Sequence, residues 1–165
     1  EVPSRGLGDV YKRQVLARVV GLFSGRGYNI ESLAVAEVDA TKNISRITIV
    51  TTGTPQVIDQ IKLQLKKLVP VHKVADFKRE DKNVIFKEMA LLKIVAQKKK
   101  IDKCLKECKK FNPVILDKTN KSVVVQITAL RREIDKMSKK LKPYGLTSTS
   151  RTGAIAMTRG ADTFK

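Results

Sequence analysis

The sequence predicts an α+β protein made of two βαββαβ units in tandem, and two observations support this fold class. Segments with helical periodicity and segments typical of strands follow one another in nearly the same order in each half of the chain. The chain has 165 residues, 42 % of them hydrophobic, which is enough for two small domains that each have a core. The order of the elements therefore sets the domain boundaries.

The first half has the order helix, strand, strand, helix, strand. The first helix is predicted from residue 15, because apolar residues recur at i, i+3, i+4 and i+7 and two glycines follow. Residues 29–38 and 45–53 are β-rich and are joined by the polar connector DATKN. A second helix begins at Thr54 and Pro55, and residues 71–77 are predicted to form a strand. One strand before residue 15 would complete a βαββαβ unit.

The second half repeats this order with its opening strand present. The predicted elements are a strand at 90–96, a helix at 99–111, strands at 113–118 and 122–128, a helix at 131–145, and a final strand with its exit at 147–160. This is the order of the ferredoxin-like fold. We therefore predict domains at residues 15–79 and 87–165, joined by a charged linker at 80–86.

The chain is strongly basic, with 34 Lys and Arg against 16 Asp and Glu and a net charge of +18. The lysines are spread over nearly every predicted helix, which is typical of solvated helix faces. A basic βαββαβ protein that presents lysines to RNA is the alternative. The two β-rich runs of the first half contain no aromatic pair on which bases would stack, so nucleic acid is the less favoured partner.

We find no catalytic or metal-binding set in the sequence. Its one histidine, His72, lies in a predicted strand, and its acidic residues are dispersed. Cys104 and Cys108 share an apolar helix face, which favours buried reduced thiols over a metal half-site or a disulfide. The glycine-rich run GLFSGRGYN follows a helix and precedes a strand, the reverse of a dinucleotide site. We expect no enzyme activity, metal or cofactor in this chain.

No apolar run approaches the length of about 20 residues that a membrane span requires. The N-terminus also lacks the pattern of a secretory signal. We therefore expect a cytoplasmic protein without a membrane partner.

Asn29 follows a glycine-containing turn and precedes Ile30 at the start of a predicted strand. Its amide offers both a donor and an acceptor, which suits the ammonium or carboxylate group of a small zwitterion. The alternative is a turn asparagine that satisfies its own backbone.

Residues 16–35, LARVVGLFSGRGYNIESLAV, closely resemble the signature of the acetolactate synthase small regulatory subunit family, whose N-terminal half is an ACT domain. The resemblance continues through SRITIVTTG, QIKLQLKKLVPVHKV, KEMALLKI and SRTGAIAMTRG, and it covers residues 15–160. It implies an N-terminal ACT domain and a C-terminal domain of related topology. It also implies a homodimer in which the ACT domains pair side by side.

The function implied by this resemblance is regulatory. Such a subunit has no catalysis of its own. It binds and activates a large catalytic subunit that carries thiamine diphosphate, FAD and Mg²⁺, and it confers feedback inhibition by valine or another branched-chain amino acid. A stand-alone ACT sensor that acts on another enzyme is an alternative.

The resemblance also suggests effector-binding residues. In the family the effector lies between the helix start of one subunit and the strand start of its partner. Leu16 and Ala17 match the helix start, and Asn29 and Ile30 match the strand start.

Residues 1–14 depart from the family pattern. The family has an aliphatic first strand that ends in E-N-x-x-G, whereas residues 10–14 here are VYKRQ, so Tyr11 and Gln14 replace the asparagine and glycine. The hexapeptide DVYKRQ is the translation of GAT GTG TAT AAG AGA CAG, which resembles a transposon end used in sequencing libraries. We expect residues 1–14 to be a non-native segment in place of the first strand, and residues 1–13 to be irregular or poorly packed.

Overall fold

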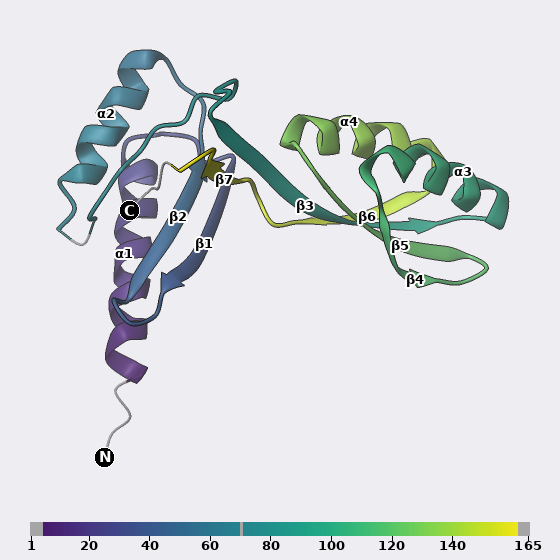
Figure 1. Cartoon of the computed structure of the whole chain (residues 1–165), viewed down its shortest axis with the longest axis horizontal. Helices are drawn as coiled ribbons and strands as arrows, with labels where there is room; N and C mark the ends of the chain where they lie inside the picture. The colour runs from purple at the N-terminus through teal and green to yellow at the C-terminus, as the bar shows by residue number, and fades with distance from the viewer. Residues whose placement is uncertain (1–4, 70, 162–165) are drawn as a thin grey trace. The chain divides into compact units, whose positions relative to one another are not determined.

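The computed structural model describes residues 5–69 and 71–161, with side chains described from residue 14 onward. The chain divides into two compact units, Glu1–Val84 with Thr158–Lys165, and Ile85–Met157 (Figure 1). Within the described part of the chain, no helix is long and apolar enough to cross a membrane.

The described residues of the first unit form two helices and a two-stranded sheet. These elements are α1 (Arg5–Gly25), β1 (Ser32–Asp39), β2 (Ile44–Val50) and α2 (Pro55–Lys66), with β1 and β2 paired antiparallel. The Thr54 hydroxyl caps α2 by accepting a hydrogen bond from the amide of Val57 at 3.4 Å, as the predicted helix start requires. Val19, Phe23 and Ile61 are the buried hydrophobic residues of its core.

The predicted polar turn joins β1 to β2. A carboxylate oxygen of Asp39 accepts hydrogen bonds from the Thr41 amide (3.0 Å), the Thr41 hydroxyl (2.6 Å) and the Lys42 amide (3.2 Å). These bonds, that from the Thr41 hydroxyl above all, lower the pKa of Asp39. Asn43 has a φ of 52° in the left-handed region, which asparagine tolerates better than most residues.

The prediction of a strand at residues 71–77 is wrong, because residues 71–78 have no regular secondary structure. His72 consequently lies in an irregular, exposed segment and not in a strand. In a βαββαβ sheet the first strand lies between the third and the fourth. Since none of the described residues forms that first strand, residues 71–77 have no described strand beside which to form a ladder.

Residues 1–13 are predicted to be irregular or poorly packed. The irregular conformation is wrong from residue 5 onward, because α1 begins at Arg5. The packing of these residues stays a prediction, because their side chains lie outside the described part of the chain. Residues 1–4 lie outside the described residues. The segment does not form a strand, but Tyr11 to Gln14 continue the helix. Lysine, arginine and glutamine are good helix formers, and the glycine that the family has at position 14 is absent.

The second unit is a complete ferredoxin-like βαββαβ fold, followed by a short additional strand. Its elements are β3 (Val84–Val95), α3 (Lys98–Cys108), β4 (Val114–Lys118), β5 (Ser122–Ala129), α4 (Arg131–Leu141), β6 (Leu146–Arg151) and β7 (Ile155–Thr158), with 3-10 turns at Lys109–Phe111 and Lys142–Tyr144. The sheet order is β4-β5-β3-β6, and β7 also pairs with β3. The predicted fold class is therefore confirmed.

Two boundaries in this half differ from the prediction. β3 begins at Val84, so the last three residues of the expected linker belong to the strand. The expected final strand is two strands, β6 and β7, separated at a bend where Gly153 has a φ of 83°. A residue with this φ cannot continue an extended strand.

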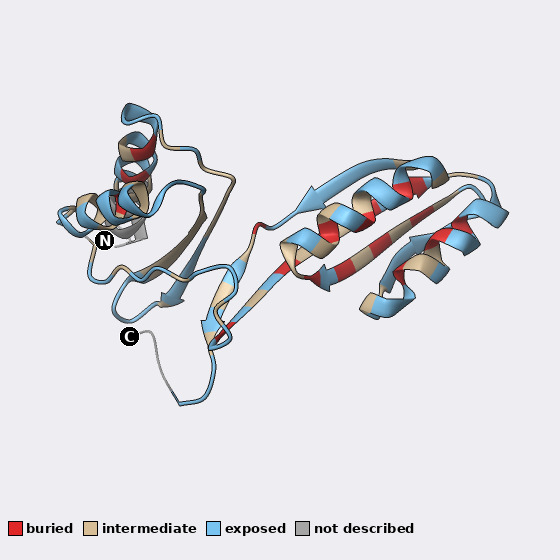
Figure 2. Ribbon diagram, turned by 90° about the horizontal axis from the view of Figure 1, so that it is seen from above, coloured by how far each residue is buried: buried red, intermediate tan, exposed pale blue. Residues whose placement is uncertain are grey.

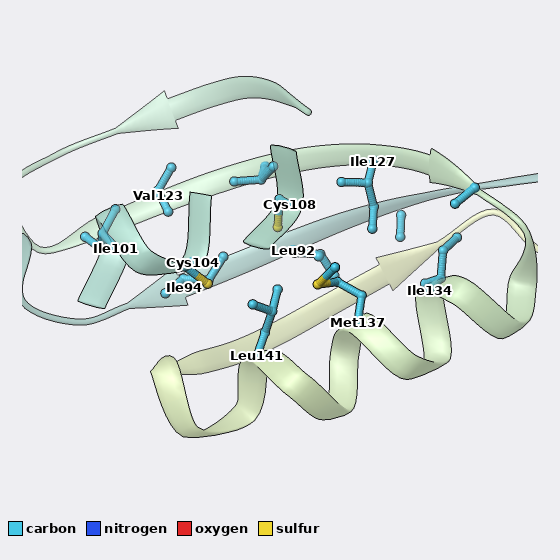
Figure 3. Packing of buried hydrophobic residues seen from close by; sticks show 13 residues of the cluster. Leu92, Ile94, Ile101, Cys104, Cys108, Val123, Ile127, Ile134, Met137 and Leu141 are labelled. Carbon is cyan, nitrogen blue, oxygen red and sulfur yellow. The ribbon is translucent and has the colours of Figure 1, made fainter. Parts of the chain in front are cut away.

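The core of the second unit lies between its sheet and its two helices (Figure 3). Antiparallel pairing places Leu92 of β3 opposite Val125 of β5 and Thr149 of β6. Alternate residues therefore face the helices. The buried residues are Ala90, Leu92, Ile94, Ile101, Cys104, Cys108, Val123, Val125, Ile127, Ala129, Ile134, Met137 and Leu141.

One charged side chain, Glu88, is buried at the end of this core and is 2 % exposed. Its two carboxylate oxygens accept hydrogen bonds from Arg151 Nε (2.7 Å) and Nη2 (3.0 Å). Arg151 Nη1 also donates to Asp135 of α4 at 2.5 Å. This arginine thus connects β3, β6 and α4 through charge-assisted hydrogen bonds.

Candidate functional site

The loop between α1 and β1 carries two of the four predicted effector residues, and the end of α1 determines its shape. The Gly27 amide donates to the Ser24 carbonyl (3.2 Å), and the Tyr28 amide donates to the Phe23 carbonyl (2.9 Å). Gly27 has a φ of 68°. This pattern is a Schellman motif, in which a left-handed glycine ends the helix.

Two contacts of Tyr28 fix the direction of the loop. Its ring packs edge-to-face on Phe23, with ring centroids 6.0 Å apart and planes at 82°. Its hydroxyl donates to Gln60 Oε1 of α2 at 3.3 Å. The chain therefore leaves the helix in a defined direction just before the predicted site.

Asn29 presents its amide to solvent. Its backbone carbonyl accepts a hydrogen bond from the Thr51 hydroxyl at 2.6 Å. Its side chain is exposed and makes no hydrogen bond to any other described residue. The interpretation as an asparagine that satisfies its own backbone is therefore wrong, and the amide is free to act as both donor and acceptor.

Ile30 lies beside Asn29 but faces the other way. It is half-buried and packs against the core of the first unit, together with Ile47 and Ile49 of β2. The next residue, Glu31, donates its amide to the Val50 carbonyl at 2.8 Å. Ile30 therefore anchors the loop and offers only part of its side chain to a ligand.

Leu16 and Ala17 are not at a helix start, which corrects the prediction. They lie more than ten residues after the first residue of α1, Leu16 half-buried and Ala17 exposed. In a helix interior each backbone amide donates to the carbonyl four residues earlier, so these amides are not available to a carboxylate. The cause is the helical continuation through the exposed Gln14, where the family has glycine.

The structure does not bring the two pairs of residues together within one chain. At a rise of about 1.5 Å per residue, Leu16 lies about 13 Å along the helix axis from the C-terminal end of α1. Asn29 and Ile30 follow that end. The resemblance assigns the two pairs to different subunits, and that arrangement stays a prediction.

The helix dipole at this loop favours a cation over a phosphate, while Arg26 adds a positive side chain to the same turn. The carbonyl groups at the C-terminal end of α1 give it a partial negative charge. The glycine-rich run lies at this end, which agrees with discounting it as a phosphate site. Among the described residues, no group of three or more His, Cys, Asp or Glu side chains is placed to hold a metal ion.

Cys104 and Cys108 are buried free thiols, as predicted. Burial raises the pKa of Cys104 to about 12 and that of Cys108 to about 11. Both thiols therefore stay protonated at neutral pH and are poor nucleophiles and poor metal ligands.

Sequence reasoning missed Thr51 and Gln60, which hold the loop at Asn29 and Tyr28. Thr51 contacts a residue 22 positions earlier in the chain, and Gln60 one 32 positions earlier. No local pattern predicts contacts at such separations. The only available signal was the polar end of the strand predicted at residues 45–53, where Thr51 lies.

Comparison with known protein families defines the class of domain to which the first unit belongs. Residues 14–73 match the family model described as the AHAS small subunit-like ACT domain. The first unit therefore belongs to the ACT-domain class.

The second comparison identifies the family. Residues 87–160 match the model described as the small subunit of acetolactate synthase. The chain is 34 % identical over 149 residues to the acetolactate synthase small subunit of Mycobacterium bovis, covering 90 % of this chain and 87 % of that protein. It is 36 % identical over 146 residues to that of Aquifex aeolicus, covering 88 % and 74 %. The chain belongs to the acetolactate synthase small subunit family.

A solved structure agrees with this assignment. The crystal structure of the acetolactate synthase small subunit from Thermotoga maritima superposes with a TM-score of 0.76 at 31 % sequence identity. The superposition covers 90 % of this chain and 91 % of that one. The recognition made from residues 16–35 is therefore confirmed.

Proposed function

We propose that this chain is a non-catalytic regulatory subunit that binds the large catalytic subunit of acetolactate synthase and activates it. The observation that supports this most directly is the match of both units, in order, to family models named for this small subunit. In this proposal the catalytic partner holds thiamine diphosphate, FAD and Mg²⁺, and this chain acts as a cytoplasmic homodimer through its ACT domains.

We further propose that valine or another branched-chain amino acid is the feedback effector and that the loop at Asn29 takes part in binding it. The free amide of Asn29 and the negative end of α1 suit an amino acid with an ammonium group. An effector shifts the equilibrium between two states of an enzyme only if it binds one of them more tightly. An effector bound between two subunits meets this condition when the subunits are arranged differently in the two states.

The test measures acetolactate formation from pyruvate by the cognate large subunit, with and without this chain and with and without valine. The proposal expects an increase in rate on adding the chain. The proposal is contradicted if the rate does not change at any ratio of the two subunits, both with this chain and with a variant whose N-terminus is restored to the family pattern.

The altered N-terminus requires a second version of the chain. This restored variant carries an aliphatic strand before residue 10 and the substitutions Val10→Glu, Tyr11→Asn and Gln14→Gly. We expect valine to inhibit the complex with the restored variant more strongly than the complex with the unchanged chain. The reason is that a glycine at position 14 lets backbone amides approach the carboxylate group of valine.

The role of Asn29 is tested in the restored variant. Asn29→Ala is expected to weaken valine inhibition and to leave activation unchanged. Asn120→Ala, in an exposed turn of the second unit, is the matched control. Equal valine sensitivity of the two alanine variants would exclude Asn29 from the effector site.

A further inference from the structure

The positive charge of the chain is concentrated in the second unit. Between Ile85 and Met157 there are 18 Lys and Arg residues against six Asp and Glu, a net charge of +12 out of +18 for the whole chain. This unit also holds 15 of the 24 lysines in less than half of the sequence. This unit is therefore richer in lysine than the rest of the chain.

Most of these charges lie on one surface. The helices α3 and α4 cover the same face of the sheet, and their inner sides are buried in the core (Figure 2). Their outer sides and the following 3-10 turns form the basic helix layer, whose exposed residues are Lys98, Lys99, Lys100, Lys103, Lys106, Lys109, Lys110, Arg132, Lys136, Lys139, Lys140 and Lys142.

The four acidic residues of the two helices neutralise only part of this layer, because only Glu107 is paired with one of its members. Glu107 accepts from Lys140 at 2.5 Å, and Asp135 accepts from Arg151 at 2.5 Å. Glu133 caps α4 by accepting from the Leu130 amide at 3.1 Å. Asp102 lies 4.0 Å from Lys118 of β4. Within the described residues, Lys140 is the only member of the layer with a carboxylate partner.

The remaining lysines are arranged unfavourably for an isolated helix. Lys99, Lys103 and Lys106 are spaced by four and three residues on the outer side of α3. Like charges at these spacings repel one another and destabilise a helix. A surface with an excess of one charge is therefore stabilised by a partner of the opposite charge.

We propose that the basic helix layer docks an acidic surface of the catalytic subunit. The inference rests on the proposed function and extends it by assigning the second unit a contact surface of its own. Interfacial charge pairs of this kind raise the association rate and are weakened by salt.

The composition of the layer favours a protein partner over a nucleic acid. Eleven of its twelve members are lysines, so Arg132 alone offers the planar guanidinium group that binds phosphates in a bidentate manner. The aromatic rings nearest to it, Phe111 and Tyr144, are half-buried and give bases little to stack on. Lysine, with its flexible stem, pairs readily with carboxylates whose positions vary.

The experiment measures the dissociation constant of the complex with the large subunit at several salt concentrations. The layer variant carries Lys99→Glu, Lys103→Glu, Lys106→Glu and Lys136→Glu. Its matched control carries the same four changes at exposed lysines outside the layer, Lys78, Lys82, Lys87 and Lys121. We expect the layer variant to bind at least about tenfold more weakly and to lose most of the salt dependence, and the control to change by less than about threefold.

The folding of the layer variant is checked by thermal melting before its binding is measured. Because the layer variant removes repulsion, its melting temperature at low salt is expected to equal or exceed that of the unchanged chain. If the layer variant instead melts lower, the charge-neutral version with glutamine at the same four positions replaces it in the binding assay.

The outcomes separate the two proposals. If the unchanged chain binds the large subunit and the layer variant binds it equally well with the same salt dependence, the docking surface is wrong and the proposed function stands. If neither the unchanged chain nor the restored variant binds at low salt, both proposals fail. If random-sequence RNA binds at about 150 mM salt and only RNA binding depends on the layer, the surface serves nucleic acid and the docking proposal is overturned.

Discussion

Glu88 shows how strongly one buried charge constrains the second unit. Its carboxylate is removed from water and depends on Arg151 for compensation. Replacing Arg151 by methionine leaves this charge buried without a partner. We expect Arg151→Met to lower the free energy of unfolding by about 3 kcal/mol, measured by urea denaturation of the full chain.

The double variant Glu88→Met with Arg151→Met provides the control, because it removes the unpaired charge together with its partner. It is expected to recover most of the loss. Asp135→Asn removes only the more exposed contact of the same arginine, whose carboxylate is 45 % exposed, and is expected to cost less than about 1 kcal/mol. An equal loss in the single and the double variant would show that packing, and not charge, is responsible.

The two cysteines give a prediction about pH. Their pKa values of about 12 and 11 lie above the ordinary thiol value of 9.0, so folding disfavours their thiolates. The preference of the folded chain for protonated thiols contributes stability that is fully present below pH 9. This contribution is lost as the pH rises from about 9 to about 11 for Cys108 and to about 12 for Cys104. We expect a thiol reagent to label neither cysteine of the folded chain between pH 7 and 9 within minutes, and both in denaturant, as measured by mass spectrometry. Rapid labelling of the folded chain would contradict the burial.

At the scale of elements, the sequence patterns correctly predicted helices such as α2 and α4, whose formation depends on residues close together in the chain. Thr54 and Pro55 start α2, and the apolar spacing of residues 131–141 gives α4. Residues 71–77 have a similar local signal for a strand, yet no strand forms. A strand requires a hydrogen-bonding partner, and an alternating pattern contains no information on whether that partner is present.

The candidate site was predictable to a similar extent. Gly27 indicated the turn that ends α1, so the place of Asn29 directly after this turn followed from the sequence, whereas its exposure is known from the structure. The continuation of α1 through Leu16 and Ala17 could not be predicted in this way, because the family pattern assumes a strand and a glycine before these two residues. Local helix propensity determines the conformation once that strand is absent.

This explanation predicts how the restored variant behaves. An aliphatic strand that ends in E-N-x-x-G is expected to pair with β2 on one side and with residues 71–77 on the other. Hydrogen exchange at residues 71–77 should then slow markedly, and α1 should begin near Leu16. If exchange at residues 71–77 does not change although the new strand is protected, the missing strand is not the cause of their irregular conformation.

The origin of residues 1–14 is tested by amplifying the coding DNA from its source. A continuous reading frame that encodes DVYKRQ would show that this segment is native.

At the scale of the whole molecule, the two units differ in how much they bury. Among the residues whose side chains the structure describes, the first unit has a core cluster of three buried hydrophobic residues beside a two-stranded sheet, whereas the second has thirteen around a sheet of five strands. Burial of apolar surface is the main source of stability, and two strands alone are at best marginally stable. The first unit should therefore be the less stable of the two.

We expect the amides of β1 and β2 to lose protection from hydrogen exchange at a lower urea concentration than those of β3 and β5. The restored variant should narrow this difference, since a central strand adds apolar contacts to the first unit only. Simultaneous loss of protection in both units would contradict the expectation, because it would require the units to unfold cooperatively. Since the predicted effector loop belongs to the first unit, an effector that binds only the folded form should raise the urea concentration of this first transition and not that of the second.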